Sequence, residues 1–340
     1  MVTDSELSTR SGYTFYHEER LSQAAAHLKE RAHISICGLP GTGKSTFVRQ
    51  LISRETRKRF ELDDGFLMVL LDGREFAHLP LEYIWGAICT ALSCARSGSS
   101  VVCRKEGAQG VSYEDLKATL RSLKNYRVVV LLDDCSSLPH IQPEQSVCCG
   151  FLHLDKRYSP TLVTAPNPPS VAPACIPEVR DQFVLMHLEI SPEQALRFAD
   201  GGLSRSVLDR DLRDRISREI VDWVGGNLYL LDRACYWAAK ESEILSTGHV
   251  YTDFSRTVYE RCLKEAEQLF AAWWRILGER EQIILLAIDQ LQRSAASWHS
   301  VTEALSGRGF VRRRSDRYLI HPKMFSDYVS RVAPSPLHPE

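Results

Sequence analysis

The first half of the chain alternates short apolar runs with amphipathic segments. Runs rich in Val, Ile and Leu predict strands, and uninterrupted runs are typical of strands that are buried on both faces of a sheet. The strands expected are His33–Cys37, Phe66–Asp72, Val128–Asp134, Thr161–Ala165 and Val184–Leu188. Between them, apolar residues recur at helical spacing near 19–30, 46–52, 81–95 and 113–124, whereas the Gly- and Ser-bearing stretch 96–110 is expected to be a surface loop. Because strands alternate with helices, the pattern predicts an α/β fold with a parallel, doubly wound sheet.

The last part of the chain has a different pattern, in which helices dominate. Helices are expected near Glu279–Leu291 and Trp298–Leu305, and they precede two short strands within Gly309–Ile320 that a charged turn joins. A final helix is expected over Pro322–Val332, before a proline-rich tail that we expect to be disordered. Two helices, a short hairpin and a closing helix look like a winged helix.

A glycine-rich stretch, Gly38–Thr46, lies between a predicted strand and a predicted helix and fits the pattern G-x-x-x-x-G-K-[ST] at every fixed position. Glycines let the backbone curl until its N–H groups point inward, and the following helix adds the positive end of its dipole. Such a loop binds a polyphosphate, with Lys44 on the β and γ phosphates and Ser45 on Mg²⁺. A glycine-rich turn without this function is the alternative. The residues expected to bind nucleotide are Gly38, Leu39, Pro40, Gly41, Thr42, Gly43, Lys44, Ser45 and Thr46.

Two carboxylates end the apolar run Val128–Asp134, which has the form of a Walker B strand. We expect Asp133 to hold Mg²⁺ through the water shell of the metal, and Asp134 to position or activate the attacking water. Without the glycine-rich loop, two acids at a strand end would be read as a helix cap or a turn. At the end of the next predicted strand, Thr164 and Asn167 are candidates for sensing the γ phosphate, and simple turn chemistry is the alternative for both.

Composition limits the class of protein. The chain has 340 residues, is 44% hydrophobic and 25% charged, and carries a formal net charge of -1, as expected for a soluble globular protein of two or three domains. No apolar run approaches the length of a membrane span, and the first residues are polar, so we expect a cytoplasmic protein. The ten cysteines form no C-x-x-C pair, which favours reduced core thiols over zinc ligands or disulfides. Near-neutral charge gives no global attraction to nucleic acid, so such binding would need a local patch.

The order of these motifs resembles the STAND branch of the AAA+ ATPases and, more distantly, the origin-recognition ATPases. Gly38–Thr46 and Val128–Asp134 match the two nucleotide motifs of this family without gaps. The segment Thr14–Leu21 looks like a degraded form of the family's entry segment, with His17-Glu18 in place of Gly-Arg. The resemblance therefore implies an ATPase core that requires ATP or ADP and Mg²⁺.

The resemblance extends past the core. Leu188–Ala195 is similar to the link into a helical lid, and Trp223–Leu231 resembles the lid motif G-G-x-P, with Leu228 where the proline would be. The family likeness thus implies a P-loop NTPase sheet, an α-helical lid and a C-terminal winged-helix domain. The implied segments are a disordered N-terminus at 1–13, the ATPase core at 14–190, the lid at 191–253, the winged helix at 254–332 and a disordered tail at 333–340.

The resemblance suggests roles for Arg180 and for five arginines of the predicted wing, and each has an alternative. Arg180 precedes the last core strand, where AAA+ relatives carry an arginine that reaches the phosphate site of a neighbouring subunit; a surface arginine in a charged turn is the alternative. Five arginines crowd into the predicted wing, 308–317, where they can hold DNA phosphates, dock on acidic parts of the ATPase domain in the resting state or remain solvated. These five are Arg308, Arg312, Arg313, Arg314 and Arg317.

Two hypotheses about function follow. The first is an ATP-dependent molecular switch, slow as a hydrolase, whose nucleotide state controls oligomerisation or docking of a separate effector or sensor protein, in a setting such as bacterial conflict or antiviral signalling. The second is a DNA-binding ATPase of the origin-recognition or transposition-regulator kind that uses the winged helix. A small-molecule P-loop kinase is disfavoured, because roughly half of the chain is lid and winged helix.

Overall fold

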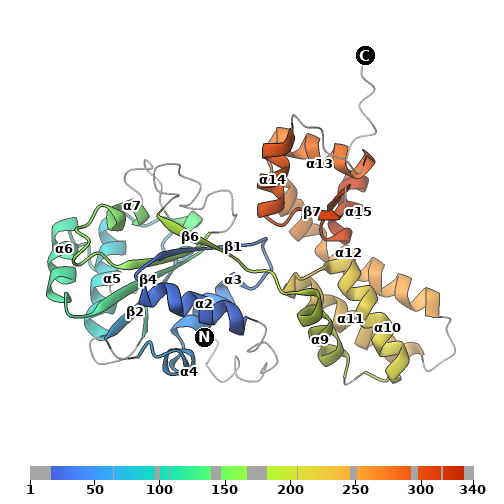
Figure 1. The fold of residues 1–340 in the computed structure, drawn as a ribbon, viewed down its shortest axis with the longest axis horizontal. Coiled ribbons are helices and arrows are strands. Elements are labelled where there is room, and N and C mark those ends of the chain that lie inside the picture. Colours follow the sequence, from blue (N-terminus) through green and yellow to red (C-terminus); the bar gives the residue numbers. More distant parts are fainter. Residues whose placement is uncertain are drawn as a thin grey trace, which may run out of the picture. The chain divides into compact units, whose positions relative to one another are not determined.

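The structure is a computed structural model, and the residues that it describes fall into two compact units. It describes residues 17–332 apart from 64, 96–99, 107, 139–146, 167–181, 205, 246–250, 292–297 and 315–316. One unit comprises residues 17–37 and 44–188, and the other contains residues 38–43 and the chain from Glu189 onward. Figure 1 gives the elements of both units.

The first unit is built on a six-stranded sheet with the order β3-β2-β4-β5-β1-β6. Every neighbouring pair in this sheet is parallel. Its strands are β1 (His33–Cys37), β2 (Phe66–Asp72), β3 (Val101–Val102), β4 (Arg127–Asp133), β5 (Thr161–Ala165) and β6 (Phe183–His187). The parallel α/β sheet predicted from the sequence is therefore confirmed.

Helices cover both faces of the sheet, because successive side chains of a strand point to opposite faces. Leu67, Val69 and Leu71 of β2 lie in one apolar core, and the alternate residues Met68 and Leu70 lie in another. The first core is covered by α5 (Leu81–Ala95), α6 (Tyr113–Ser122) and α7 (Val147–Leu152), and the second by α2 (Glu18–Lys29) and α3 (Lys44–Ile52) (Figure 1). This arrangement is the doubly wound architecture expected.

Local signals explain where several of these helices begin. The Ser112 side chain accepts a hydrogen bond from the backbone N–H of Asp115, whose carboxylate accepts one from the N–H of Ser112 in return, a capping box that starts α6. Ser53 likewise caps α4 (Arg54–Arg59) by accepting a hydrogen bond from the N–H of Thr56.

One strand and the ends of two others differ from the sequence prediction. The stretch 96–110, expected to be a loop, contains the edge strand β3, in which Val101 pairs with Val69 of β2. A strand of two residues has no periodicity to detect, since main-chain pairing alone defines it. Strands β4 and β6 each begin and end one residue earlier than predicted. Asp134 therefore lies outside β4, in a left-handed conformation.

The second unit is helical apart from one hairpin. It contains α9 (Pro192–Leu203), α10 (Arg210–Val224), α11 (Leu228–Leu245), α12 (Tyr251–Arg275), α13 (Glu279–Leu291), α14 (His299–Gly307) and α15 (Lys323–Val332). The strands β7 (Val311–Arg314) and β8 (Arg317–Ile320) form an antiparallel pair. One continuous apolar core runs through this unit, and α12 packs against both α11 and α15. The helices and the hairpin expected after residue 279 are thus present, while the division into lid and winged helix at residue 254 stays a prediction.

Among the described helices, none is both long enough and apolar enough to cross a membrane.

Candidate nucleotide-binding site

The glycine-rich loop joins β1 to α3, as its pattern requires. Gly41 and Gly43 have φ angles of 91° and 93°, in the left-handed region where only glycine is unstrained. The hydroxyl and the N–H of Thr42 both donate to the carbonyl oxygen of Leu39, at 2.9 and 3.2 Å, and close the turn. Helix α3 begins at Lys44, directly after the loop. The chain therefore has the local backbone that lets a phosphate-binding loop lead into a helix N-terminus.

The loop is also held from the second unit, to which residues 38–43 belong. The Asn227 side-chain amide donates a hydrogen bond to the carbonyl oxygen of Pro40 at 3.1 Å, and the Tyr229 N–H donates to that of Gly41 at 3.0 Å. A Cβ atom on Gly41 would lie 2.8 Å from Oδ1 of Asn227, so any other residue here would displace the Asn227 side chain. Asn227 and Tyr229 lie in the segment Trp223–Leu231, which the sequence analysis identified by its two glycines without predicting either hydrogen bond.

At the start of α3, Ser45 meets the end of β4. The Ser45 hydroxyl donates a hydrogen bond to Oδ1 of Asp133 at 2.9 Å, although the two residues lie 88 positions apart. Asp133 is 2% exposed, and its second oxygen, Oδ2, is buried with no hydrogen-bond partner among the described residues. A buried carboxylate oxygen without a donor, beside a hydroxyl, is a ligand set that suits Mg²⁺. Ser45 and Asp133, the two predicted metal ligands, would hold such an ion here.

Burial controls the charge of Lys44 and Asp133. Burial lowers the pKa of Lys44 to about 8, and the neighbouring carboxylates of Asp133 and Asp134 and the thiols of Cys37 and Cys135 only partly offset it. Burial also raises the pKa of Asp133, against the hydrogen bond from Ser45. Burial thus disfavours the charged form of each group, and a bound ion of opposite charge would favour it again. Such shifts are typical of a phosphate and metal site.

The lowered pKa of Lys44 predicts a pH dependence of nucleotide affinity. Below about pH 8 the free protein carries the ammonium ion that a phosphate needs, whereas above that pH the ion is lost. A bound phosphate raises the pKa again, so binding takes up a proton and the Kd for ADP should rise by up to about tenfold per pH unit above 8. Calorimetric titration with ADP between about pH 7.5 and 9.5 measures this. Lys44→Arg, whose charge does not titrate in this range, should give a flat profile. A wild-type profile that is equally flat would contradict the assignment.

Asp134 follows Asp133 in a strained backbone conformation, with φ of 48° and ψ of 44°. Gly73 leaves room for this conformation, because a Cβ atom on Gly73 would lie 2.3 Å from the carbonyl oxygen of Asp134. The N–H of Gly73 also donates to the carbonyl oxygen of Asp133 at 2.7 Å. The Asp134 side chain accepts a hydrogen bond from the Ser136 hydroxyl at 3.2 Å. Burial raises its pKa. The Asp134 carboxyl group thus has a fixed backbone and a raised affinity for a proton.

The sequence analysis missed a pair of charges at the end of β2. Arg74 donates from Nε and from its terminal nitrogen to Asp72, at 3.0 and 2.6 Å, and its Nε also lies 3.7 Å from Oδ2 of Asp134. Burial would raise the pKa of Asp72, but the hydrogen bonds and the charge of Arg74 leave it below its ordinary value. In the sheet, Asp72 pairs directly with Asp133. The signal was visible, because Asp72 ends an apolar run just as Asp133 does.

The other predicted site residues lie as follows. Thr46 is exposed on the first turn of α3. Thr164 is fully buried, and its hydroxyl donates to the carbonyl oxygen of Ile34 at 3.5 Å; its role as a phosphate sensor stays a prediction. Asn167 and Arg180 lie outside the described residues.

Comparisons with known proteins agree with this fold. No protein-family model and no curated protein sequence matches the chain. Among solved structures, the Walker-type ATPase of Pyrococcus abyssi is similar, with a TM-score of 0.61 and 13% sequence identity over 93% of this chain and 96% of that one. The ADP form of the ORC2 protein of Aeropyrum pernix has a TM-score of 0.52 and 15% identity over 93% of this chain and 94% of its own. At such identities the likeness is one of fold: the chain has the α/β fold of the P-loop NTPases.

Proposed function

We propose that this protein is an ATP-binding molecular switch that hydrolyses ATP slowly with Mg²⁺. The observation that carries the proposal is the hydrogen bond between Ser45 and Asp133, which joins the motif after β1 to the motif at the end of β4. Lys44 and the loop backbone would hold the β and γ phosphates, Ser45 and Asp133 the metal, and Asp134 the attacking water. When bound, Mg²⁺ would neutralise charge on the phosphates.

Contacts inside the second unit support the switch. Asn227, which touches the loop, also begins α11 by accepting a hydrogen bond from the N–H of Leu230 at 3.2 Å. Two residues earlier, Gly225 packs so closely on the His321 ring that a Cβ would lie 2.2 Å from it. His321 in turn lies 3.4 Å from the carboxylate of Glu189. A movement of the loop can therefore be transmitted to the region of the hairpin through Asn227, Gly225 and His321.

The arginines of the wing support docking over DNA binding. Arg312 of β7 forms an ion pair with Glu189, and Arg308 forms one with Glu281 at 2.6 Å. Arg308 also lies over the ring of Phe310, and its side chain is only 16% exposed. Two of the five wing arginines are thus engaged by carboxylates of the same unit, which lowers what the basic wing 308–317 can offer to DNA phosphates.

In the mechanism that we propose, ADP and ATP stabilise different positions of Asn227 and the hairpin, and the pair of Arg312 with Glu189 holds the resting state. The likeness of the motifs to STAND proteins extends the proposal to nucleotide-dependent oligomerisation and to a separate effector or sensor, of the kind used in bacterial conflict or antiviral signalling. A DNA-binding ATPase remains the second reading, and no described contact favours it.

The test combines nucleotide analysis of the purified protein with its mass in ADP and in a non-hydrolysable ATP analogue. We expect co-purified ADP and a larger assembly in the analogue. Arg312→Glu should raise the assembled fraction or the basal ATPase by about fivefold, since a half-exposed ion pair contributes up to about 1 kcal/mol. Arg314→Glu, an equal charge change at an exposed position of β7, is the control.

The charge-swapped protein, with Arg312→Glu and Glu189→Arg together, should return to the wild-type level. Equal mass in both nucleotides for all these proteins would contradict the switch. Loss of duplex DNA binding in Arg312→Glu, with unchanged ATPase, would favour the second reading instead.

A further inference from the structure

A pocket lies at the N-terminal ends of β2 and β4, opposite the strand ends that carry Asp72 and Asp133. It has a volume of about 560 Å³, within the range of small-molecule sites. Its lining comes from the end of α2, the turn before β1 and the first residues of β2 and β4. Arg127 begins β4 and Asp133 ends it, and at about 3.3 Å per residue the two ends of this strand are about 20 Å apart. A ligand in this pocket is therefore distinct from one on the glycine-rich loop.

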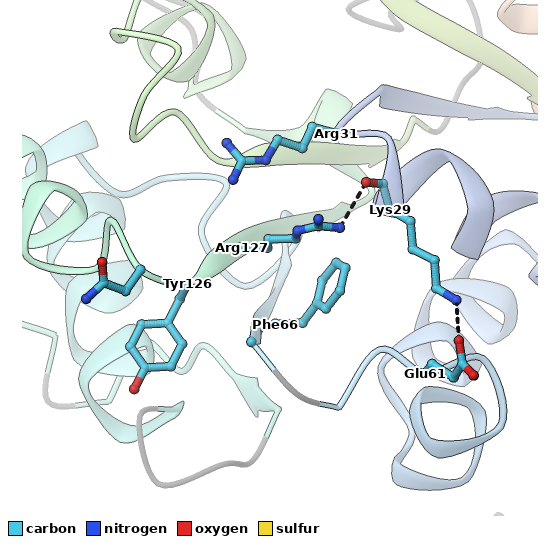
Figure 2. Close-up of a pocket in the computed structure, with 8 residues that line it drawn as sticks. Lys29, Arg31, Glu61, Phe66, Tyr126 and Arg127 are labelled. Carbon is cyan, nitrogen blue, oxygen red and sulfur yellow. Dashed lines mark hydrogen bonds and ion pairs between the residues drawn. The ribbon is translucent and has the colours of Figure 1, made fainter.

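Positive charge dominates the pocket. Among its lining residues, Lys29, Arg31 and Arg127 are cationic, and Glu61 is the one carboxylate. Glu61 pairs with Lys29 at 3.0 Å, so it neutralises the lysine and leaves the charge of the two arginines. Figure 2 shows the Lys29 side chain directed at Glu61, away from Arg31 and Arg127. The pocket is therefore suited to an anion.

Arg127 is held in place in advance of any ligand. One terminal nitrogen donates to the carbonyl oxygen of Lys29 at 2.9 Å, and the guanidinium lies over the Phe66 ring, 5.3 Å from its centroid (Figure 2). Its remaining N–H groups have no hydrogen-bond partner in the part of the chain that the structure describes. A planar guanidinium that is fixed on one side and open on the other is suited to a phosphate oxygen pair.

Two helix ends bring residues to the rim of this pocket. Arg31 has a φ of 60° and Glu61 a φ of 54°. Each follows the C-cap of a helix, α2 or α4, and the N–H of the residue after it donates to the carbonyl oxygen five positions earlier. A left-handed residue at this position is a common helix ending, and here it leads the chain from each helix to the pocket.

An aromatic side chain completes the lining. Tyr126 immediately precedes β4 and is 41% exposed. Figure 2 shows its ring directed away from Arg31 and Arg127, so the lining has anion-binding groups in one part and a flat apolar face in another. The volume, the charge and the ring match a small ligand with a phosphate group at one end and a planar ring at the other.

We propose that this pocket binds a small phosphorylated ligand of mononucleotide size. Arg31 and Arg127 hold the phosphate, and Tyr126 contacts the ring. The pocket provides the protein with a second ligand site, independent of the nucleotide on the loop.

The test is a calorimetric titration of the full chain, saturated with Mg²⁺ and ADP so that the loop is filled, with uridine 5′-monophosphate. We expect one further equivalent to bind, no binding of uridine, and at least about tenfold weaker binding of inorganic phosphate. Arg127→Ala and Arg31→Asn should each raise the Kd for uridine monophosphate at least about tenfold, as expected for the loss of a charge-assisted hydrogen bond. Asparagine is chosen at position 31 because it tolerates a positive φ.

Arg104→Ala removes the same charge from an exposed position of the first unit outside the pocket and should leave binding unchanged. Unfolding midpoints of all variants separate loss of binding from loss of fold. The proposal is overturned if the monophosphate does not bind at millimolar concentration, or binds equally to Arg127→Ala and Arg31→Asn. It is also overturned if only a single-stranded oligonucleotide binds through these arginines, since the pocket would then serve a polymer backbone.

Discussion

Replacing Asp134 with asparagine should leave ATP binding intact and lower the rate of hydrolysis by at least about a hundredfold, the scale of a positioned catalytic group. The substitution keeps the shape of the side chain and its acceptor for the Ser136 hydroxyl, but it removes the negative charge that orients a water. Asparagine also tolerates the left-handed backbone at this position. Phosphate release under single-turnover conditions, together with the Kd for ATP, measures both effects.

The matched control for this change is Asp155→Asn. Asp155 lies in the same unit and accepts hydrogen bonds from Arg157 at the surface, so the same chemical change there should alter neither quantity. Normal hydrolysis by Asp134→Asn would show that another group positions the water. Asp72 would then be examined first, because it lies in register with Asp133 at the same edge of the sheet.

Replacing Lys44 with alanine should abolish ATP binding, with a Kd at least about a hundredfold higher, since several charge-assisted hydrogen bonds to phosphate oxygens are lost together. Lys44 is only 7% exposed and is the first residue of α3. Alanine is a good helix former, so the fold should be retained. Equilibrium dialysis with labelled ATP provides the measurement, and an unchanged unfolding midpoint in the absence of nucleotide confirms the fold.

Lys58→Ala is the control, because Lys58 is an exposed residue of α4 in the same unit. If Lys44→Ala bound ATP as tightly as Lys58→Ala, the glycine-rich loop would have to be read as a structural turn. The two outcomes thus separate the interpretations that the sequence alone left open.

Much of the first unit could be predicted because its signals are local. β1, β2 and β5 were predicted with the bounds that the structure gives, since each is an apolar run between turn residues. The loop was identified from its glycines, lysine and hydroxyl, and the meeting of Ser45 with Asp133 was implied by the roles that the two motifs have. Helix α5 also agrees with its predicted bounds.

The rest depends on which strands are neighbours, and no local pattern encodes that. Arg74 and Gly73 act on Asp134 because β2 lies beside β4, although some 60 residues separate them in the chain. The pocket that Arg31 and Arg127 line likewise needs the starts of β2 and β4 side by side. The contact of Asn227 with Pro40 joins residues 187 positions apart, and an asparagine in a glycine turn gives no hint of such a partner.

The sheet order has a consequence for synthesis of the chain. In the described sheet, β1, which precedes the glycine-rich loop, pairs with β5 and β6, the last two strands of this sheet to be made. From Cys37 to Thr161 the ribosome adds 161 − 37 = 124 residues, which takes about 6–25 s at ~5–20 residues per second. During that interval β2 and β4 can pair while the apolar residues Ile34 and Ile36 have no sheet to join. The nascent chain thus exposes an unpaired strand for seconds, as chaperones require of a substrate, and the proposed nucleotide could bind only after most of the first unit has been made.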